Sequence, residues 1–401
     1  MKADLAPRPP RSPIRVALYS HDTFGLGHFS RCVKIARALS IGLGPVEGIF
    51  ITGQPHTSLF TAPPGYRCVR LPAVTKCPDG NYAARDAGTN LTAVVAERRR
   101  LIADAIGAFT PDLLIVDNVP CGLRREIVPA LRHRAVHPNA RTVLALRDVL
   151  DDPEAVRREW ERDGADEALQ MYDEIWVFGD TGDAAALVAE GPLSQVASKV
   201  IACGLLGSSV EPRSNGSACR SRPNVIVTSG GGADGDDVVR LYLDALRRFR
   251  PQVSSRIVLG PDFAHRAQRE LTSHNGFDAS IERSAPNLGS RFASADVVVS
   301  MAGYNTVCEV RAAGAAALLV PRVRPRREQW IRAEKLATSG RAKVLHPDTI
   351  NPRSLWVAVE ELLEMPSPVP EALTGGRKAM SRAAWLLGAE CAGVLQPLTT
   401  S

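Results

Sequence analysis

Short apolar runs alternate with stretches in which apolar positions recur every three or four residues along most of the chain. Continuous apolar runs between helical patterns are typical of parallel strands that are buried on both faces, so we predict an α/β fold. In the first half the strand-like runs and the amphipathic helical stretches lie at 14–19, 29–39, 48–52, 91–109, 112–116, 141–146 and 174–178.

This alternation stops at a stretch rich in Ser, Pro, Gly and Arg at 208–222, and then resumes. We read that stretch as a connection between two domains, because 401 residues exceed what one core usually supports. The later pattern predicts strands and helices at 224–228, 236–248, 256–259, 296–299, 316–320 and 381–395. We therefore expect a disordered tail (1–13), an N-terminal Rossmann-like domain (14–205), a linker (206–222), a C-terminal Rossmann-like domain (223–375) and a last helical segment (376–401) that packs on the first domain.

Composition narrows the possible function classes. The eight cysteines form no Cys-x-x-Cys pair and no zinc spacing with His, so we expect no metal site and a reducing, cytoplasmic environment. The sequence has no apolar run of the length that spans a membrane. The net charge of +6 is spread along the chain. A non-enzymatic anion-binding or nucleic-acid-binding protein remains an alternative, but we expect no nucleic-acid partner.

The loop after the first apolar run carries the first candidate chemistry. Gly25 and Gly27 let backbone amides approach a ligand closely, and the following helix adds partial positive charge. The glycine spacing matches neither the dinucleotide-binding pattern nor the Walker loop. His28 stands where the loop meets the helix, and the positive helix end disfavours imidazolium. A neutral His28 suits a general base, although capping or packing of the loop is the alternative role.

Two strand-to-helix turns in the second half are suited to binding phosphate. After the apolar run at 224–228, the turn of Ser229, Gly230 and Gly231 allows main-chain amides to wrap an anion, or serves simply as a flexible turn. After the run at 296–299, Gly303 permits a tight turn before a helix. The residues of that helix with candidate roles are Asn305 and Thr306, whose amides suit a diphosphate, and Glu309, one turn later, whose carboxylate suits ribose hydroxyls.

A further loop and two strand ends complete the candidate set. Arg326 follows the apolar run at 316–320 and can balance phosphate charge, or belongs to a solvated basic loop. Glu328 and Gln329 come next and can read sugar hydroxyls. Asp117 and Asp148 follow two apolar runs of the first half, where they would face a cleft and act as alternative bases, or cap helices.

These motifs together resemble a known family. Residues 300–309, the strand that ends at Val320-Pro321, and Glu328-Gln329 resemble the C-terminal domain of glycosyltransferase family 28. The loop at 25–28 is similar to the Gly-rich loop ending in His of that family. From 14 to 363 the chain resembles a bacterial group of predicted glycosyltransferases.

The resemblance implies a GT-B fold, with two doubly wound domains and an interdomain cleft, and a sugar donor activated by UDP. It implies no cofactor besides the UDP-sugar co-substrate, and no obligatory metal. By position, the resemblance implies that Asn305, Thr306 and Glu309 bind the diphosphate and the ribose. It implies that Glu328 and Gln329 bind the sugar, and that the backbone near Arg283 and Ser284 contacts the nucleotide base. The expected reaction is transfer to an acceptor hydroxyl or amine, with inversion and with His28 near the reaction centre.

The partners implied are a nucleotide-sugar donor and a small-molecule or lipid-linked acceptor, with possible peripheral membrane association. The chain departs from the family at Met301 to Tyr304, where Arg-Ala-Gly-Ala is frequent, and at Glu328, where His often precedes Gln. Both departures lie in the donor pocket and leave the sugar open. The spacing from Gly25 to Cys32 also resembles the UDP-sugar hydrolases of pseudaminic acid synthesis, so hydrolysis is an alternative, and nucleotide-sugar epimerisation is another.

Overall fold

The computed structural model describes residues 13–21, 26–76, 82–85, 88–133, 139–189, 191–207, 222–231, 234–263, 278–285 and 288–389. The predicted tail, apart from its last residue, and the Ser/Pro-rich part of the predicted linker lie outside these ranges. So do Gly25 and residues 390–401.

Seven parallel strands form the first sheet, in the spatial order β3-β2-β1-β6-β7-β8-β9. The central strands are almost wholly buried, as expected when helices cover both faces. An antiparallel hairpin, β4 with β5, lies outside this sheet. The strands are β1 (Ile14–Tyr19), β2 (Val46–Thr52), β3 (Tyr66–Arg70), β4 (Val74–Lys76), β5 (Tyr82–Ala84), β6 (Leu113–Asp117), β7 (Arg141–Arg147), β8 (Glu174–Phe178) and β9 (Val200–Ala202).

Helices cover both faces of this sheet and enclose two apolar layers. Local signals set several helix starts: Asn90 accepts from the Thr92 amide, and Asp152 accepts from the Glu154 amide ahead of a helix that opens with proline. The helices of the first half are α1 (Gly27–Gly42), α2 (Leu91–Phe109), α3 (Val128–His133), α4 (Pro153–Asp163), α5 (Ala165–Met171) and α6 (Thr181–Ala189).

A second parallel sheet has the order β12-β11-β10-β13-β14-β15 and again lies between two apolar layers. The predicted α/β class with two parallel sheets is therefore confirmed. These elements are β10 (Asn224–Thr228), α7 (Asp236–Phe249), β11 (Ser254–Val258), β12 (Ala279–Glu282), α9 (Leu288–Phe292), β13 (Val297–Ser300), α10 (Tyr304–Ala313), β14 (Ala316–Leu319), α11 (Glu328–Thr338), β15 (Ala342–Val344) and α12 (Pro352–Glu364).

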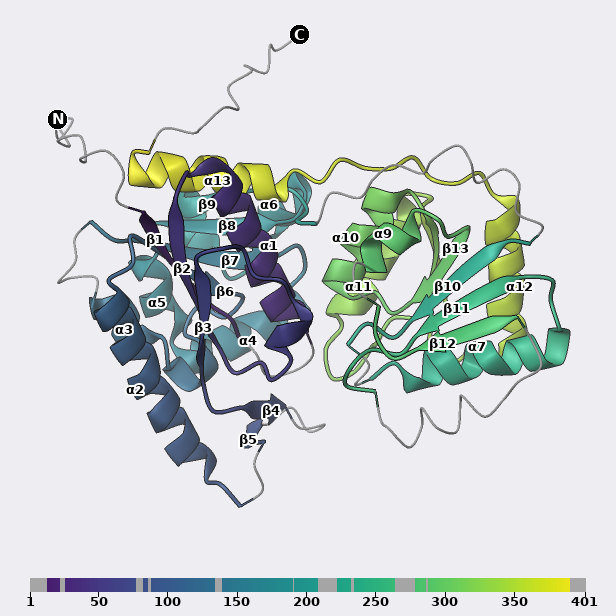
Figure 1. Ribbon diagram of the computed structural model, residues 1–401, viewed down its shortest axis with the longest axis horizontal. Coiled ribbons are helices and arrows are strands. Elements are labelled where there is room, and N and C mark those ends of the chain that lie inside the picture. The colour runs from purple at the N-terminus through teal and green to yellow at the C-terminus, as the bar shows by residue number, and fades with distance from the viewer. Residues whose placement is uncertain are drawn as a thin grey trace, which may run out of the picture.

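The last helix, α13 (Gly375–Leu387), returns to the first half of the molecule and lies along α1 (Figure 1). Its bounds differ from the predicted 381–395. The Gly375-Gly376 pair, which we interpret from the sequence as a break, forms the first turn of this helix. Glycine is required at 375 by close packing, because an added Cβ would lie 2.7 Å from the Leu205 carbonyl oxygen. The helix ends at Gly388, whose φ of 61° is left-handed.

Each sheet reverses its strand order once, and these two points position the site. In the first sheet the reversal falls between β1 and β6, and in the second between β10 and β13. Ligands of doubly wound sheets bind beyond the carboxyl ends of the strands at such points. The predicted loops after β1, β10 and β13 all leave the sheets there.

Across the described ranges, every helix is too short or too polar to cross a bilayer.

Candidate functional site

His28 and Asp117 meet at the reversal point of the first sheet. His28 is the second residue of α1, and Asp117 is the last residue of β6. The His28 Nδ1 atom lies 2.6 Å from Asp117 Oδ2. This contact joins residues 89 positions apart, and it brings two of the three predicted catalytic residues together.

The charges around this pair define its protonation. Burial raises the pKa of Asp117, but the Arg31 guanidinium and then His28 outweigh that effect and lower it to about 2. Arg31 bonds the second carboxylate oxygen through Nε, at 2.7 Å, and through Nη2. Burial lowers the pKa of His28 below its ordinary value, although Asp117 opposes the shift. His28 is therefore neutral near pH 7, with Nδ1–H donated to Asp117 and the Nε2 lone pair available.

Asp117 is itself poorly suited to take a proton, because it stays ionised and both of its oxygens are occupied by His28 and Arg31. Its geometry suits it to hold one tautomer and one orientation of His28.

Asp148 does not fit the predicted role of an alternative base. Its two oxygens accept from Arg332 of α11, with Nε to Oδ2 at 2.8 Å and Nη2 to Oδ1 at 2.7 Å. Both side chains are buried, and the pair joins the two halves of the molecule. Asp148 is thus an anchor between the two sheets rather than a free carboxylate.

The turn after β10 has the shape that a phosphate loop needs. Gly230 adopts a φ of 67°, and no atom of the described residues lies within 4 Å of the place that a Cβ would take. Ser229 is buried, and its hydroxyl donates to the Leu259 carbonyl oxygen rather than facing a ligand. The Gly231 carbonyl oxygen accepts from the Asp262 amide, which fixes the loop against the turn after β11.

The turn after β13 opens α10 and faces α1 of the other half. Gly303 is its N-cap, and no side chain of the described residues caps the helix, so such a group does not block the first-turn amides, including that of Thr306. The side-chain nitrogen of Asn305, Nδ2, donates to the Gly27 carbonyl oxygen at 3.1 Å. Glu309 accepts from Lys34 of α1 at 2.9 Å through one carboxylate oxygen. The amino ends of α1 and α10 therefore lie next to each other.

Glu328 is buried at the start of α11 in a strongly cationic environment. Its Oε1 accepts from Arg322 at 2.6 Å, whereas its Oε2 is buried and has no hydrogen-bond partner among the residues that the structure describes. Burial raises the pKa of Glu328, but Arg322, Arg147 and other arginines outweigh burial and lower it below its ordinary value. An ionised, half-satisfied carboxylate suits a ligand hydroxyl. Gln329 is also buried, and its side-chain oxygen accepts from the Arg322 amide at 3.3 Å.

The remaining predicted residues lie at varying distances from this centre. Arg326 pairs with Glu159 of α4 at 2.6 Å, so it links the halves and is not a free phosphate ligand. Arg283 donates to the Pro261 carbonyl oxygen, and Ser284 is exposed. Gly25 lies outside the described residues.

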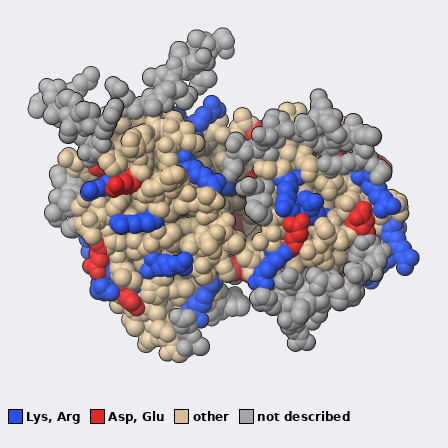
Figure 2. All heavy atoms as spheres, in the orientation of Figure 1, with Lys and Arg blue, Asp and Glu red and all other residues tan. Residues whose placement is uncertain are grey.

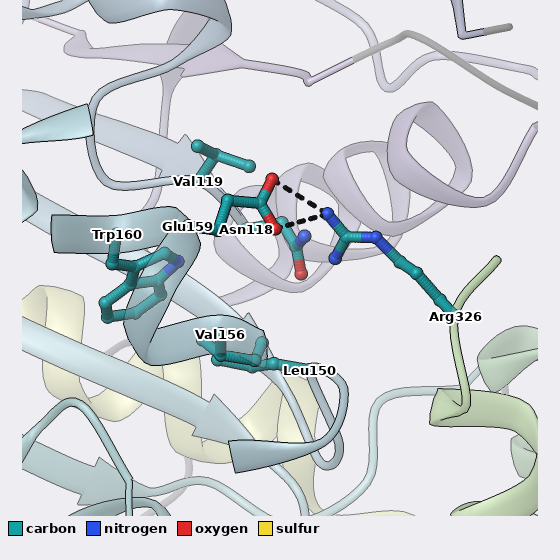
Figure 3. Close-up of a pocket in the computed structure, with 7 residues that line it drawn as sticks. All are labelled: Asn118, Val119, Leu150, Val156, Glu159, Trp160 and Arg326. Carbon is teal, nitrogen blue, oxygen red and sulfur yellow. Dashed lines mark hydrogen bonds and ion pairs between the residues drawn. The ribbon is translucent and has the colours of Figure 1, made fainter. Parts of the chain in front are cut away.

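A small pocket adjoins the site on the side of the first half. Its volume is about 10 Å³, which is room for about one water molecule, and the Arg326–Glu159 pair crosses it (Figure 3). Its lining residues are Asn118, Val119, Leu150, Val156, Glu159, Trp160 and Arg326. On the face drawn in Figure 2 a groove separates the two lobes, and Lys and Arg are spread over both lobes without gathering in one patch.

Further polar contacts between the halves surround the site. They include Lys335 with Asp183, Arg311 with Asp180, and His56 with Asp262. Sequence reasoning missed these pairs, and it also missed Arg31 and Lys34. The helical spacing of His28, Arg31 and Lys34 was a usable signal, since all three lie on one face of α1.

Comparison with known proteins identifies the second half. Residues 225–383 match the model of the glycosyltransferase family 28 C-terminal domain. A Haemophilus influenzae UDP-N-acetylglucosamine–N-acetylmuramyl-(pentapeptide) pyrophosphoryl-undecaprenol N-acetylglucosamine transferase is 36% identical over 102 residues. That match spans 24% of this chain and 29% of the relative's length.

Solved structures resemble the whole chain. MurG of Acinetobacter baumannii matches with a TM-score of 0.55 at 14% identity, over 94% of this chain and 96% of that one. CalG4, the calicheamicin glycosyltransferase, matches with a TM-score of 0.57 at 16% identity, over 94% and 95%. The predicted GT-B fold is confirmed. The chain therefore has the GT-B fold, and its residues 225–383 are similar to the C-terminal domain of glycosyltransferase family 28.

Proposed function

We propose that this protein transfers a sugar from a UDP-sugar to a hydroxyl or amine of an acceptor. The proposal is supported by one observation: the points at which the two sheets reverse their strand order lie next to each other. The His28–Asp117 pair lies at one, the amino end of α10 lies at the other, and Asn305 contacts Gly27 directly between them. A proton acceptor beside an anion-binding helix end is what displacement of a nucleoside diphosphate requires.

The donor is proposed to bind the second half. The first-turn amides of α10 and the Gly230 turn would hold the diphosphate, and Glu309 would hold the ribose. Glu309 has one carboxylate oxygen that makes no hydrogen bond within the described residues, since Lys34 bonds the other. Glu328 Oε2 and Gln329 would meet the sugar hydroxyls, and the backbone near Arg283 and Ser284 would meet the uracil base.

In the proposed reaction, His28 Nε2 takes the proton of the acceptor nucleophile as that atom attacks the anomeric carbon. The bond from this carbon to the β-phosphate oxygen breaks, and UDP leaves with the electron pair. Attack opposite the leaving group inverts the anomeric configuration. Asp117 stabilises the imidazolium that forms, because its carboxylate is held ionised by Arg31.

Three finer points belong to the same proposal. The acceptor is a small molecule or a lipid-linked molecule, since the Haemophilus influenzae relative acts on a pyrophosphoryl-undecaprenol acceptor. Peripheral association with a membrane follows if the acceptor is lipid-linked. No metal is needed when helix amides and guanidinium groups balance the charge of the leaving diphosphate.

A thermal-shift panel of UDP-, GDP- and dTDP-sugars, with and without EDTA, tests the proposal. We expect a UDP-sugar to raise the melting temperature by several degrees at concentrations well above Kd, with EDTA having no effect. The absence of any shift with every nucleoside diphosphate would contradict it. Incubation with the best donor then separates transfer from hydrolysis, because rapid release of free sugar in stoichiometric amounts without an acceptor would favour water as the acceptor.

A further inference from the structure

Arg147 stands out among the cations at the junction of the two halves. It is the last residue of β7, which is the neighbour of β6 and ends at the same edge of the sheet as Asp117. The guanidinium Nε donates to Asn118 Oδ1 at 3.1 Å. Asn118 is buried and has a φ of 65°, an uncommon conformation for a residue other than glycine. The strand end and this amide together fix the position of the Arg147 side chain.

The other arginines at this junction each have a carboxylate partner. Arg31 pairs with Asp117, and Arg332 pairs with Asp148. Arg326 pairs with Glu159, and Arg322 pairs with Glu328.

Arg147 forms no ion pair with any described residue, and its two Nη atoms make no hydrogen bond within the described part of the chain. Burial, followed by the charge of Arg31, lowers the pKa of Arg147 to about 10. A guanidinium that is oriented, partly buried and not neutralised is a binding site for an oxyanion.

The surroundings of Arg147 indicate which oxyanion it meets. Arg31 and Arg332, its cationic neighbours, lie on the ring of Tyr304, the first residue of α10, at 5.8 and 5.7 Å from the ring centroid. Arg147 also interacts electrostatically with Glu328, whose Oε2 has no hydrogen-bond partner in the described ranges of the chain. A sugar phosphate satisfies both groups, with a hydroxyl donated to Glu328 and phosphate oxygens accepting from Arg147.

We infer that Arg147, from the N-terminal half, binds the phosphate attached to the anomeric carbon and stabilises it as it departs. The inference rests on the proposed function and adds a second domain to the leaving-group site. The bond that breaks joins the anomeric carbon to an oxygen of this phosphate. The negative charge that develops on that oxygen is stabilised by the Arg147 guanidinium. Arg147 is thereby a catalytic residue on the opposite side of the cleft from the amino end of α10.

Isothermal titration calorimetry with UDP, UMP and inorganic diphosphate tests this role in the wild type, in Arg147→Gln and in a control. The control is Arg100→Gln, which removes the same charge from an exposed pair on α2. We expect Arg147→Gln to weaken UDP and diphosphate at least tenfold and to leave UMP within twofold. The control should bind all three probes like the wild type.

Thermal unfolding without ligand separates this role from a structural one. Because no described carboxylate would be left unpaired, Arg147→Gln should melt at or above the wild-type temperature. A large fall in melting temperature together with equal weakening of UDP and UMP would overturn the inference. The inference would also be overturned if Arg147→Gln bound UDP and diphosphate as tightly as the wild type does.

The probes also separate this inference from the proposed function. If the wild type binds diphosphate in an Arg147-dependent way but does not prefer UDP, the proposed donor is wrong and the role of Arg147 stands. If the wild type binds UDP and the variant binds it equally well, the proposed function stands and the role of Arg147 does not. Binding of neither probe by the wild type overturns both.

Discussion

Substitution of His28 by Asn separates the two roles that the geometry gives to this imidazole. The Asn amide nitrogen occupies nearly the position of Nδ1, so it can still donate to Asp117 Oδ2, which lies 2.6 Å from Nδ1 in the native protein. The substitution removes Nε2, which is the atom proposed to take the proton. The His28→Asn protein should therefore keep its fold and its donor site and lose the base.

The magnitude follows from what is removed and what is kept. Loss of a general base costs about 10²- to 10⁴-fold in rate, or about 2.7–5.4 kcal/mol of transition-state stabilisation. A retained hydrogen bond to Asp117 avoids the cost of about 1–3 kcal/mol that an unsatisfied buried acceptor would bring. His28→Ala, which lacks that donor, should lose the same activity and also some stability.

The assay is release of UDP from the donor identified in the thermal-shift panel, with urea unfolding and UDP calorimetry on the same preparations. We expect kcat to fall at least 100-fold in His28→Asn, with UDP affinity within twofold and unfolding free energy within about 1 kcal/mol of the wild type. A kcat within threefold of the wild type would refute the role of His28 as the base.

Four further outcomes follow from the structure. The pKa of His28 is lowered, and His28 acts as a base only when it is neutral. The acid limb of the kcat/KM profile should therefore have its midpoint below pH 6.5, and activity should stay constant as the pH rises to 8. A midpoint above pH 7 would contradict this. In Asp117→Asn the carboxylate that raises this pKa is lost, so the limb should move to still lower pH in protein that circular dichroism shows to be folded. Asp148→Asn leaves a buried Arg332 unpaired and should cost about 3–5 kcal/mol in urea unfolding, most of it regained on adding Arg332→Met. Gly260→Ala should destabilise the protein by about 1–3 kcal/mol, because its φ is 85° and a Cβ would lie 2.5 Å from a backbone oxygen of the loop after β10; an unchanged unfolding midpoint would contradict that geometry.

The fold was predictable because its strands and helices carry strong periodic signals. The apolar run of β8 and the amphipathic pattern of α2 give the observed bounds of both elements, Glu174–Phe178 and Leu91–Phe109. The extent of α13 was predicted wrongly, since glycine in its first turn is required by close packing on the other half and not by local propensity.

The candidate site was predictable only as far as it depends on strand ends. The loops of His28 and Asn305 follow strands that border the reversal points, so topology alone brings them to one region. The pairing of Asp148 with Arg332, 184 residues away, depends on how the two halves pack, and no local pattern encodes it. The same holds for Arg31, because an arginine in an amphipathic helix is ordinarily exposed and this one is buried against Asp117.

The central claim is that the amino end of α10 holds a sugar-linked diphosphate opposite His28. A crystal structure of the UDP complex tests it most directly. The account predicts diphosphate oxygens within hydrogen-bond distance of the first-turn amides of α10, with the β-phosphate on the side of His28. A diphosphate bound elsewhere, with Asn305 still bonded to Gly27 and Glu309 still bonded to Lys34, would contradict it.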